Sequence, residues 1–151
     1  MQQAKQGDFQ PFDAHDWKVG IVVAQFNKYI TDELLASALD RVKSYKVDQK
    51  NITVTTVAGS IEIPLLLQSM AKSDQYDVLL AIGCVIQGET PHFDYVCKFV
   101  SEGILRVQLD YDMPVGFGVL TCNNQSEALA RQHLGGEHLD AVMHQAKVIS
   151  S

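Results

Sequence analysis

Short apolar runs alternate along this chain with longer stretches in which apolar and polar positions follow a helical period. The short runs are rich in valine, isoleucine and threonine, and each is bounded by polar or turn-forming residues, so they predict buried β-strands. They lie at residues 17–24, 51–57, 77–84 and 114–121.

The intervening stretches predict amphipathic helices, because their apolar residues recur every three or four positions. They lie at residues 31–44, 62–73, 93–110 and about 138–148. Thr31 is expected to cap the first of them. Asn124 and Glu127 have the spacing of a capping box and predict one more helix start. Gly135 and Gly136 predict a break before the last helix.

Strands that alternate with helices predict a parallel sheet covered on both faces. We therefore expect a flavodoxin-like, three-layer αβα sandwich with a four-stranded parallel sheet, formed by residues 17–151 behind an N-terminal arm of residues 1–16. Ligands of such sheets bind beyond the carboxyl ends of the strands. The expected binding segments are residues 25–28, 58–61, 85–92 and 121–124.

The amino-acid composition excludes several classes of protein that this chain could otherwise belong to. The chain has 151 residues, a net charge of −6 and 46% hydrophobic residues, which fits one globular domain and excludes a disordered chain. No apolar run is long enough for a membrane span, and the acidic charge argues against nucleic-acid binding. Three cysteines without close spacing indicate neither a disulfide framework nor a zinc site. No signal peptide is visible, so a cytoplasmic location is expected.

Residues 83–97, GCVIQGETPHFDYVC, carry the richest candidate chemistry. Gly88 is expected to allow a tight turn from strand to helix. The amides that follow it would then lie at a helix N-terminus, which favours an anion such as phosphate. His92 at the same turn could transfer a proton near neutral pH. The simpler interpretation is a connecting loop whose Thr90 and His92 only cap the helix.

Other candidates also allow two interpretations. Phe26 could stack on a planar heterocycle while Asn27 supplies amide contacts, or Phe26 could only cover the core. Glu62 could hold a polar ligand, or it could be a favourable charge in the first turn of a helix. Arg131 could bind a phosphate, or it could be a solvated helix charge.

Four blocks of sequence, in order, resemble the lumazine synthase family over residues 17–148. They are AxFN at residues 24–27, VxGSxEIP at 57–64, GCVIxGETPHFDYVC at 83–97 and PVGFGVLT at 114–121. The resemblance implies a transferase of riboflavin biosynthesis, acting in its penultimate step. It would condense 5-amino-6-(D-ribitylamino)uracil with 3,4-dihydroxy-2-butanone 4-phosphate to form 6,7-dimethyl-8-ribityllumazine, phosphate and water. The reaction needs no metal and no redox cofactor.

The resemblance also implies roles for individual residues. His92 would transfer protons, and Phe26 would stack on the pyrimidine. The pyrimidine and ribityl contacts would come from Ser60, Ile61, Glu62, Val85 and Ile86, and the phosphate contacts from Gly88, Glu89 and Thr90. Phe117 and Arg131 would enter from a neighbouring subunit, because the family assembles as pentamers, decamers or sixty-subunit shells. Riboflavin synthase is a further expected partner.

Three positions depart from the family pattern. Ile61 stands where the family often has phenylalanine or tryptophan, and Gln87 stands where it often has arginine or lysine. No lysine follows Arg131 before Lys147. A flavin- or lumazine-binding paralogue with weak catalysis is therefore a second interpretation. A flavodoxin-like electron carrier is a third, and it rests on fold analogy alone.

Overall fold

The computed structural model describes residue 7 and residues 9–151. Its centre is a four-stranded parallel sheet in the order β2-β1-β3-β4. The strands are β1 (Val19–Ala24), β2 (Ile52–Val57), β3 (Val78–Ile86) and β4 (Val115–Cys122). Each strand that the apolar runs predicted is present, with its ends shifted by two residues at most.

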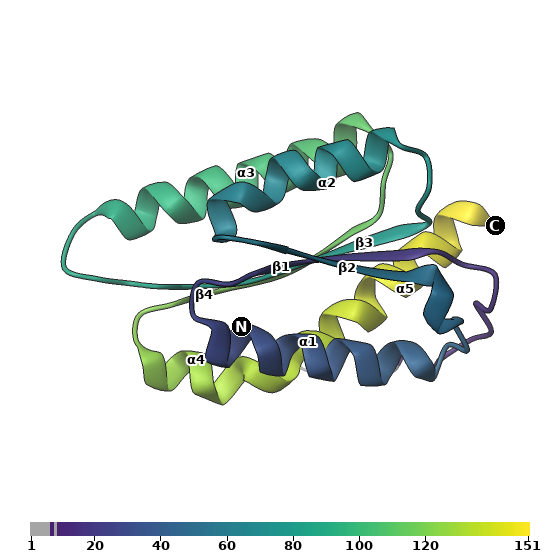
Figure 1. Cartoon of the computed structure of the whole chain (residues 1–151), viewed down its shortest axis with the longest axis horizontal. Helices are drawn as coiled ribbons and strands as arrows, with labels where there is room; N and C mark the ends of the chain where they lie inside the picture. The colour runs from purple at the N-terminus through teal and green to yellow at the C-terminus, as the bar shows by residue number, and fades with distance from the viewer. Residues whose placement is uncertain (1–6, 8) are drawn as a thin grey trace.

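In the described part of the chain, five α-helices cover the sheet from both sides (Figure 1). They are α1 (Lys28–Lys43), α2 (Ile63–Lys72), α3 (His92–Asp110), α4 (Gln125–Arg131) and α5 (Gly135–Ser150). Helices α2 and α3 form the layer above the sheet in Figure 1, and α1, α4 and α5 form the layer below it. The expected flavodoxin-like αβα sandwich is thereby confirmed. No helix in the described part of the chain is long and apolar enough to cross a membrane.

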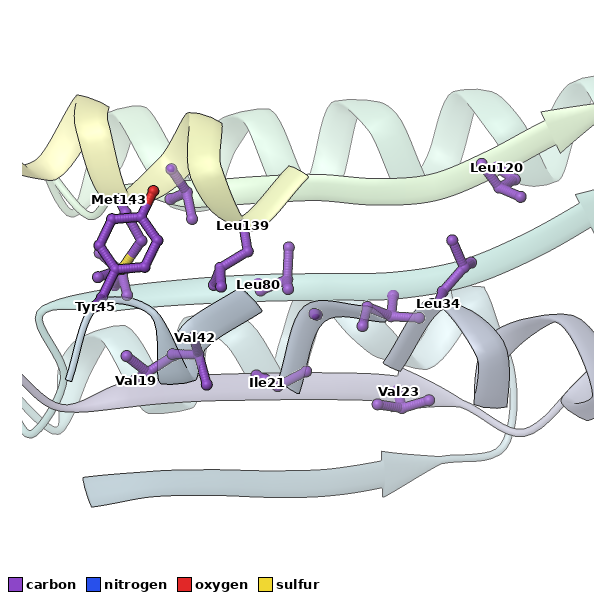
Figure 2. Packing of buried hydrophobic residues seen from close by; sticks show 14 of the residues in the cluster. Val19, Ile21, Val23, Leu34, Val42, Tyr45, Leu80, Leu120, Leu139 and Met143 are labelled. Carbon is purple, nitrogen blue, oxygen red and sulfur yellow. The ribbon is translucent and has the colours of Figure 1, made fainter. Parts of the chain in front are cut away.

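Alternation along the strands divides the core into two apolar clusters. In β3, Leu80 and Ile82 face α1 and α5, whereas Leu79 and Ala81 face α2 and α3. Figure 2 shows the first cluster, with Leu34 from α1 and Leu139 and Met143 from α5 packed over the strands. The central strands β1 and β3 are buried on both faces and are nearly continuously apolar, which is why they were visible in the sequence. The edge strand β2 is partly exposed and half threonine, and it was recognised by its β-branched residues.

Helix α1 begins earlier than expected. Its N-cap is Asn27, in a left-handed conformation with φ 61° and ψ 47°, and the helix starts at Lys28. Thr31 was therefore wrong as the cap, since it lies fully buried inside the helix. The turn from β1 is too short to leave room for three more residues, and asparagine tolerates the left-handed conformation that the turn needs.

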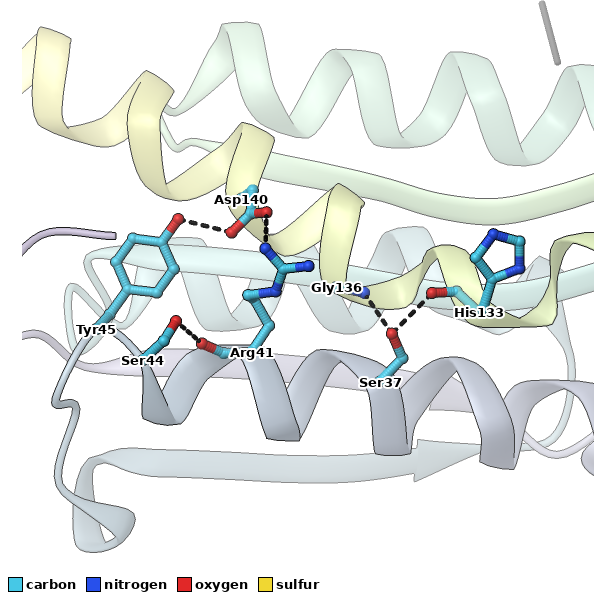
Figure 3. Close-up of polar contacts among 7 residues, drawn as sticks. All are labelled: Ser37, Arg41, Ser44, Tyr45, His133, Gly136 and Asp140. Atoms are coloured by element: carbon cyan, nitrogen blue, oxygen red, sulfur yellow. Dashed lines mark hydrogen bonds and ion pairs between the residues drawn. The ribbon is translucent and has the colours of Figure 1, made fainter. Parts of the chain in front are cut away.

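The two adjacent glycines do not break the chain, and that expectation was wrong. Gly135 and Gly136 are the first residues of α5 and press against α1. A Cβ at Gly135 would overlap the backbone carbonyl of Leu34. The Ser37 hydroxyl joins the helices by accepting the Gly136 N–H at 2.9 Å and donating to the His133 carbonyl at 2.8 Å (Figure 3).

Two further sets of hydrogen bonds stabilise the layer formed by α1, α4 and α5. The predicted start of α4 is confirmed, because Asn124 Oδ1 accepts the Glu127 N–H at 2.9 Å. The Glu127 carboxylate accepts the N–H of Asn123 at 3.1 Å rather than that of Asn124, so the reciprocal bond of the capping box is shifted by one residue. At the far end of α1, the buried carboxylate of Asp140 accepts from the Tyr45 hydroxyl and from Arg41 Nη1, both at 2.7 Å (Figure 3).

The described part of the arm packs against the same end of the molecule. Phe12 lies edge-on to the rings of Trp17, Tyr45 and His144, and the N–H of the buried Ala14 donates to the Tyr45 carbonyl at 2.8 Å. Residues 1–6 and 8 of the arm lie outside the described part of the chain. The boundary at residue 17 stays a prediction.

Candidate active site

The strand order creates a gap at the carboxyl end of the sheet. The chain passes from β1 to β2 on one side and then returns to β3 on the other, so β1 and β3 are neighbours whose connections diverge. Their pairing ends at Val23 and Ile82. Beyond it the chain from β1 follows β2 instead, with the Phe26 N–H donating to the Ala58 carbonyl at 3.0 Å. This is the switch point at which open parallel sheets bind ligands.

A cleft of about 410 Å³ opens at this gap, beneath the first turns of α2 and α3. Most of the site residues expected from the sequence line it: Phe26, Ser60, Ile61, Glu62, Val85, Ile86, Gly88, Thr90 and His92. They come from three separate segments, and no residue of the fourth expected segment, 121–124, lines the cleft. Asn27 and Gly59, which belong to the expected binding segments 25–28 and 58–61, also line it, and so do Cys84, Phe93 and Val96, to which no site role was assigned.

The walls of the cleft differ in character. The Phe26 side chain is 73% exposed, so most of its ring surface is available to a ligand. The 3-10 turn Ser60–Glu62 leads into α2 and exposes Ile61 and Glu62, while Ser60 is buried beside Gly83. One side of the cleft is therefore aromatic and apolar, and the next carries a carboxylate.

The connection from β3 to α3 reaches beyond the sheet (Figure 1) and supplies a third wall. His92 is the first residue of α3, and its N–H donates to Thr90 Oγ1 at 3.4 Å. Glu89 is exposed in this loop but does not line the cleft. Gly88 is not in a left-handed conformation, and a Cβ there would meet open space. The tight-turn reason given for this glycine was therefore wrong; its effect is to leave the loop open on the cleft side.

Two expected site residues lie elsewhere. Phe117 is in β4, on the same face of the sheet as Val115 and Val119, with 40% of its surface exposed. Arg131 ends α4, and its Nη1 donates to the Glu127 carbonyl at 2.9 Å. Neither residue lines the cleft of its own chain.

The cysteines have no features of nucleophiles. Burial raises the pKa of Cys84 to about 12, and it also raises the pKa of Cys97 and of Cys122. A raised pKa keeps the thiol protonated and unreactive near neutral pH. Within residues 7 and 9–151, no three histidine, cysteine or acidic side chains gather as metal ligands would.

Fold and cleft together define a parallel α/β protein with a small-molecule site at the switch point of its sheet.

Comparison of the sequence with known proteins identifies the family within this class. The family model for 6,7-dimethyl-8-ribityllumazine synthase matches residues 16–150. A protein of that name from Desulfovibrio desulfuricans is 46% identical over 119 residues, which cover 79% of this chain and 76% of that protein. This chain belongs to the 6,7-dimethyl-8-ribityllumazine synthase family.

Proposed function

We propose that this protein condenses 5-amino-6-(D-ribitylamino)uracil with 3,4-dihydroxy-2-butanone 4-phosphate, forming 6,7-dimethyl-8-ribityllumazine in the penultimate step of riboflavin biosynthesis. The observation that carries this proposal is the single cleft into which an exposed aromatic ring, a carboxylate and a histidine converge from separate segments. These are the groups that a planar pyrimidine, its ribityl hydroxyls and a proton transfer require.

In this proposal, Phe26 stacks on the pyrimidine, and Val85 and Ile86 line the pocket that holds it. Ser60, Ile61 and Glu62 hold the pyrimidine and the ribityl chain, with Glu62 accepting from the ribityl hydroxyls. Support comes from the open ring surface of Phe26 and from the exposed position of Glu62 across the same cleft.

The loop before α3 receives the phosphate of the second substrate. Gly88, Glu89 and Thr90 contribute backbone N–H groups and a hydroxyl, next to the positive N-terminus of a 19-residue helix. The amine of the pyrimidine attacks the ketone, and a Schiff base forms with loss of one water. Phosphate is then eliminated, the enol that remains tautomerises to a carbonyl, and the ribityl-bearing nitrogen closes the ring on that carbonyl with loss of a second water. His92 carries protons between these steps, and the main contribution of the cleft is to hold both substrates together.

Phe117 and Arg131 complete the site from the next subunit of a homopentamer, with Arg131 binding the phosphate. This is supported by their position outside the cleft of their own chain. It is also supported by large apolar side chains exposed on α2 and α3, among them Leu65, Tyr95 and Leu109. Such exposed residues are typical of a surface that another protein covers. Larger assemblies, an interaction with riboflavin synthase and a cytoplasmic location remain predictions.

The direct test of the activity is to mix both substrates with the purified protein and follow the fluorescence of the lumazine product. We expect product only when both substrates and folded protein are present. Binding of the pyrimidine without turnover would instead indicate the non-catalytic paralogue. Bound FMN with reversible reduction would indicate the electron carrier.

Complementation tests the shared site. His92→Ala and Arg131→Ala proteins, each inactive or weakly active, are unfolded and refolded together. Some interfaces of the mixed assembly then carry both wild-type residues, so part of the activity should return. The two variants refolded separately and then mixed are the matched control. No recovery in a proven mixed assembly would place both residues in one subunit, and full activity of a monomer would refute the shared site.

A further inference from the structure

The gap between β1 and β3 is bridged by one side chain. After Val23 and Ile82 the backbone pairing of these strands stops. Beyond that point Nδ2 of Asn27 donates a hydrogen bond of 2.8 Å to the carbonyl oxygen of Cys84, 57 residues away in the sequence. The side chain thus takes over the contact that a continuing strand would have made.

Asn27 also fixes the backbone of the turn between β1 and α1. Its left-handed conformation turns the chain directly into α1, where its carbonyl accepts the N–H groups of Ile30 at 2.9 Å and Thr31 at 3.1 Å. One residue therefore connects the end of β1, the start of α1 and the edge of β3. Its side-chain nitrogen already donates to the Cys84 carbonyl. The main role of the Asn27 amide is therefore this bond within the protein, and not the ligand contact expected from the sequence.

The two sides that Asn27 joins are the two sides of the cleft. Phe26 precedes it, and this ring has too little buried surface for packing to fix its position. Cys84 is followed by Val85 and Ile86, which form the facing wall. The distance between ring and wall is therefore set by the backbone on each side, and the Asn27 amide holds the two backbones together.

We propose that Asn27 is a positioning residue whose hydrogen bond to the Cys84 carbonyl sets the width of the slot between Phe26 and the β3 wall. A planar ring needs such a slot at one spacing, because aromatic stacking and van der Waals contact weaken within an ångström of the optimum. The slot binds the pyrimidine substrate, so this inference rests on the proposed function. The phosphate loop of residues 88–90 follows this wall in the chain, but Asn27 bonds to Cys84 and not to the loop, so phosphate binding serves as the comparison.

Two substitutions separate the hydrogen bond from the backbone turn. Asn27→Gly keeps the left-handed conformation without strain but removes the amide. Asn27→Asp keeps the shape and tolerates the same conformation, but it turns a carboxylate oxygen toward the Cys84 carbonyl. We expect both variants to bind the pyrimidine substrate alone about 3- to 10-fold more weakly, the loss of roughly one net hydrogen bond. Binding of inorganic phosphate, the probe for the loop, should not change.

Tyr45→Phe is the matched control, because it also removes one side-chain hydrogen bond but at the far end of α1. It should destabilise the protein and leave pyrimidine binding unchanged. Wild-type affinity in both Asn27 variants would overturn the proposal. So would equal weakening of both ligands, or weakening in the control, because either result indicates general destabilisation. A wild-type protein that neither binds the pyrimidine nor forms the lumazine would overturn the proposed function instead.

Discussion

Replacing Asp140 should destabilise the fold without altering the chemistry. Its carboxylate is 5% exposed and accepts from the Tyr45 hydroxyl and from Arg41, both at 2.7 Å. Burial, and next the hydrogen bond to Asp140, raise the pKa of Tyr45, so the phenol stays protonated as a donor. Asp140→Ala leaves that buried hydroxyl without its acceptor.

The size of the effect follows from the exposure of the partners. Removing one member of a buried ion pair costs about 3–5 kcal/mol of unfolding free energy. Arg41 is 42% exposed and can turn to water, so we expect about 3 kcal/mol for Asp140→Ala. Tyr45→Phe removes one hydrogen bond to a carboxylate and should cost roughly 1.5–3 kcal/mol. Replacing Arg41, Tyr45 and Asp140 together by Met, Phe and Leu should restore much of the loss.

Urea unfolding followed by circular dichroism measures these differences, at one fixed protomer concentration because assembly contributes to stability. The lumazine assay provides the control. Arg41 and Tyr45 lie more than three helical turns from Asn27, or about 20 Å along α1, so turnover of the folded variant should match the wild type. A loss below about 1 kcal/mol for Asp140→Ala would refute this account of the network.

Three further predictions concern single residues. His92→Ala should slow single-turnover formation of the lumazine by about 100-fold or less, at the low end of acid–base effects, because holding the substrates together dominates; an unchanged rate between pH 6 and 8 would remove His92 from the mechanism. Gly88→Ala should leave the unfolding midpoint in urea unchanged, since its Cβ meets open space, but should weaken inorganic phosphate binding; a large loss of stability would contradict this. Burial lowers the pKa of His138 below its ordinary value of 6.5, so the unfolded chain takes up the proton first and stability should fall as the pH drops below about 6.5. His138→Gln should flatten that slope in urea unfolding at several pH values, and an unaltered slope would assign it to other groups.

The central strands could be predicted because burial on both faces leaves a continuous apolar signal, and β2 because its residues are β-branched. The alternation of strands with helices predicted the parallel arrangement. The sequence could not predict where α1 and α5 begin. Thr31 is a residue type that often caps helices, and it was predicted as the cap for that reason. The helix begins earlier because α1 follows β1 after a short turn, which places the cap at Asn27. Gly135 leaves room for the backbone of Leu34, about a hundred residues earlier in the chain, and no local pattern records that approach.

The residues that line the cleft were indicated by motif rather than by periodicity, and their roles in binding and catalysis stay predictions. Residues such as Phe26 and Glu62 each had an equally good structural interpretation, and the resemblance of whole blocks favoured the functional one. The hydrogen bond from Asn27 to Cys84 could not be foreseen, because it depends on the point where two strands stop pairing. The expectation that Gly88 allows a tight turn was wrong because a glycine in the sequence does not by itself determine which backbone angles it adopts.

The contacts between α1 and α5 also constrain how the protein is made. Ser37 and Gly136 are 99 residues apart, and so are Arg41 and Asp140. During synthesis, α2 and α3 can cover their face of the sheet as soon as β4 has left the ribosome, because both helices precede that strand. On the opposite face α1 is made early, but the part that α5 covers, over β3 and β4 with Leu80, stays open until α5 has been added. At typical rates of about 5–20 residues per second, that part is exposed for some seconds on every nascent chain, so it is the surface on which a chaperone would act.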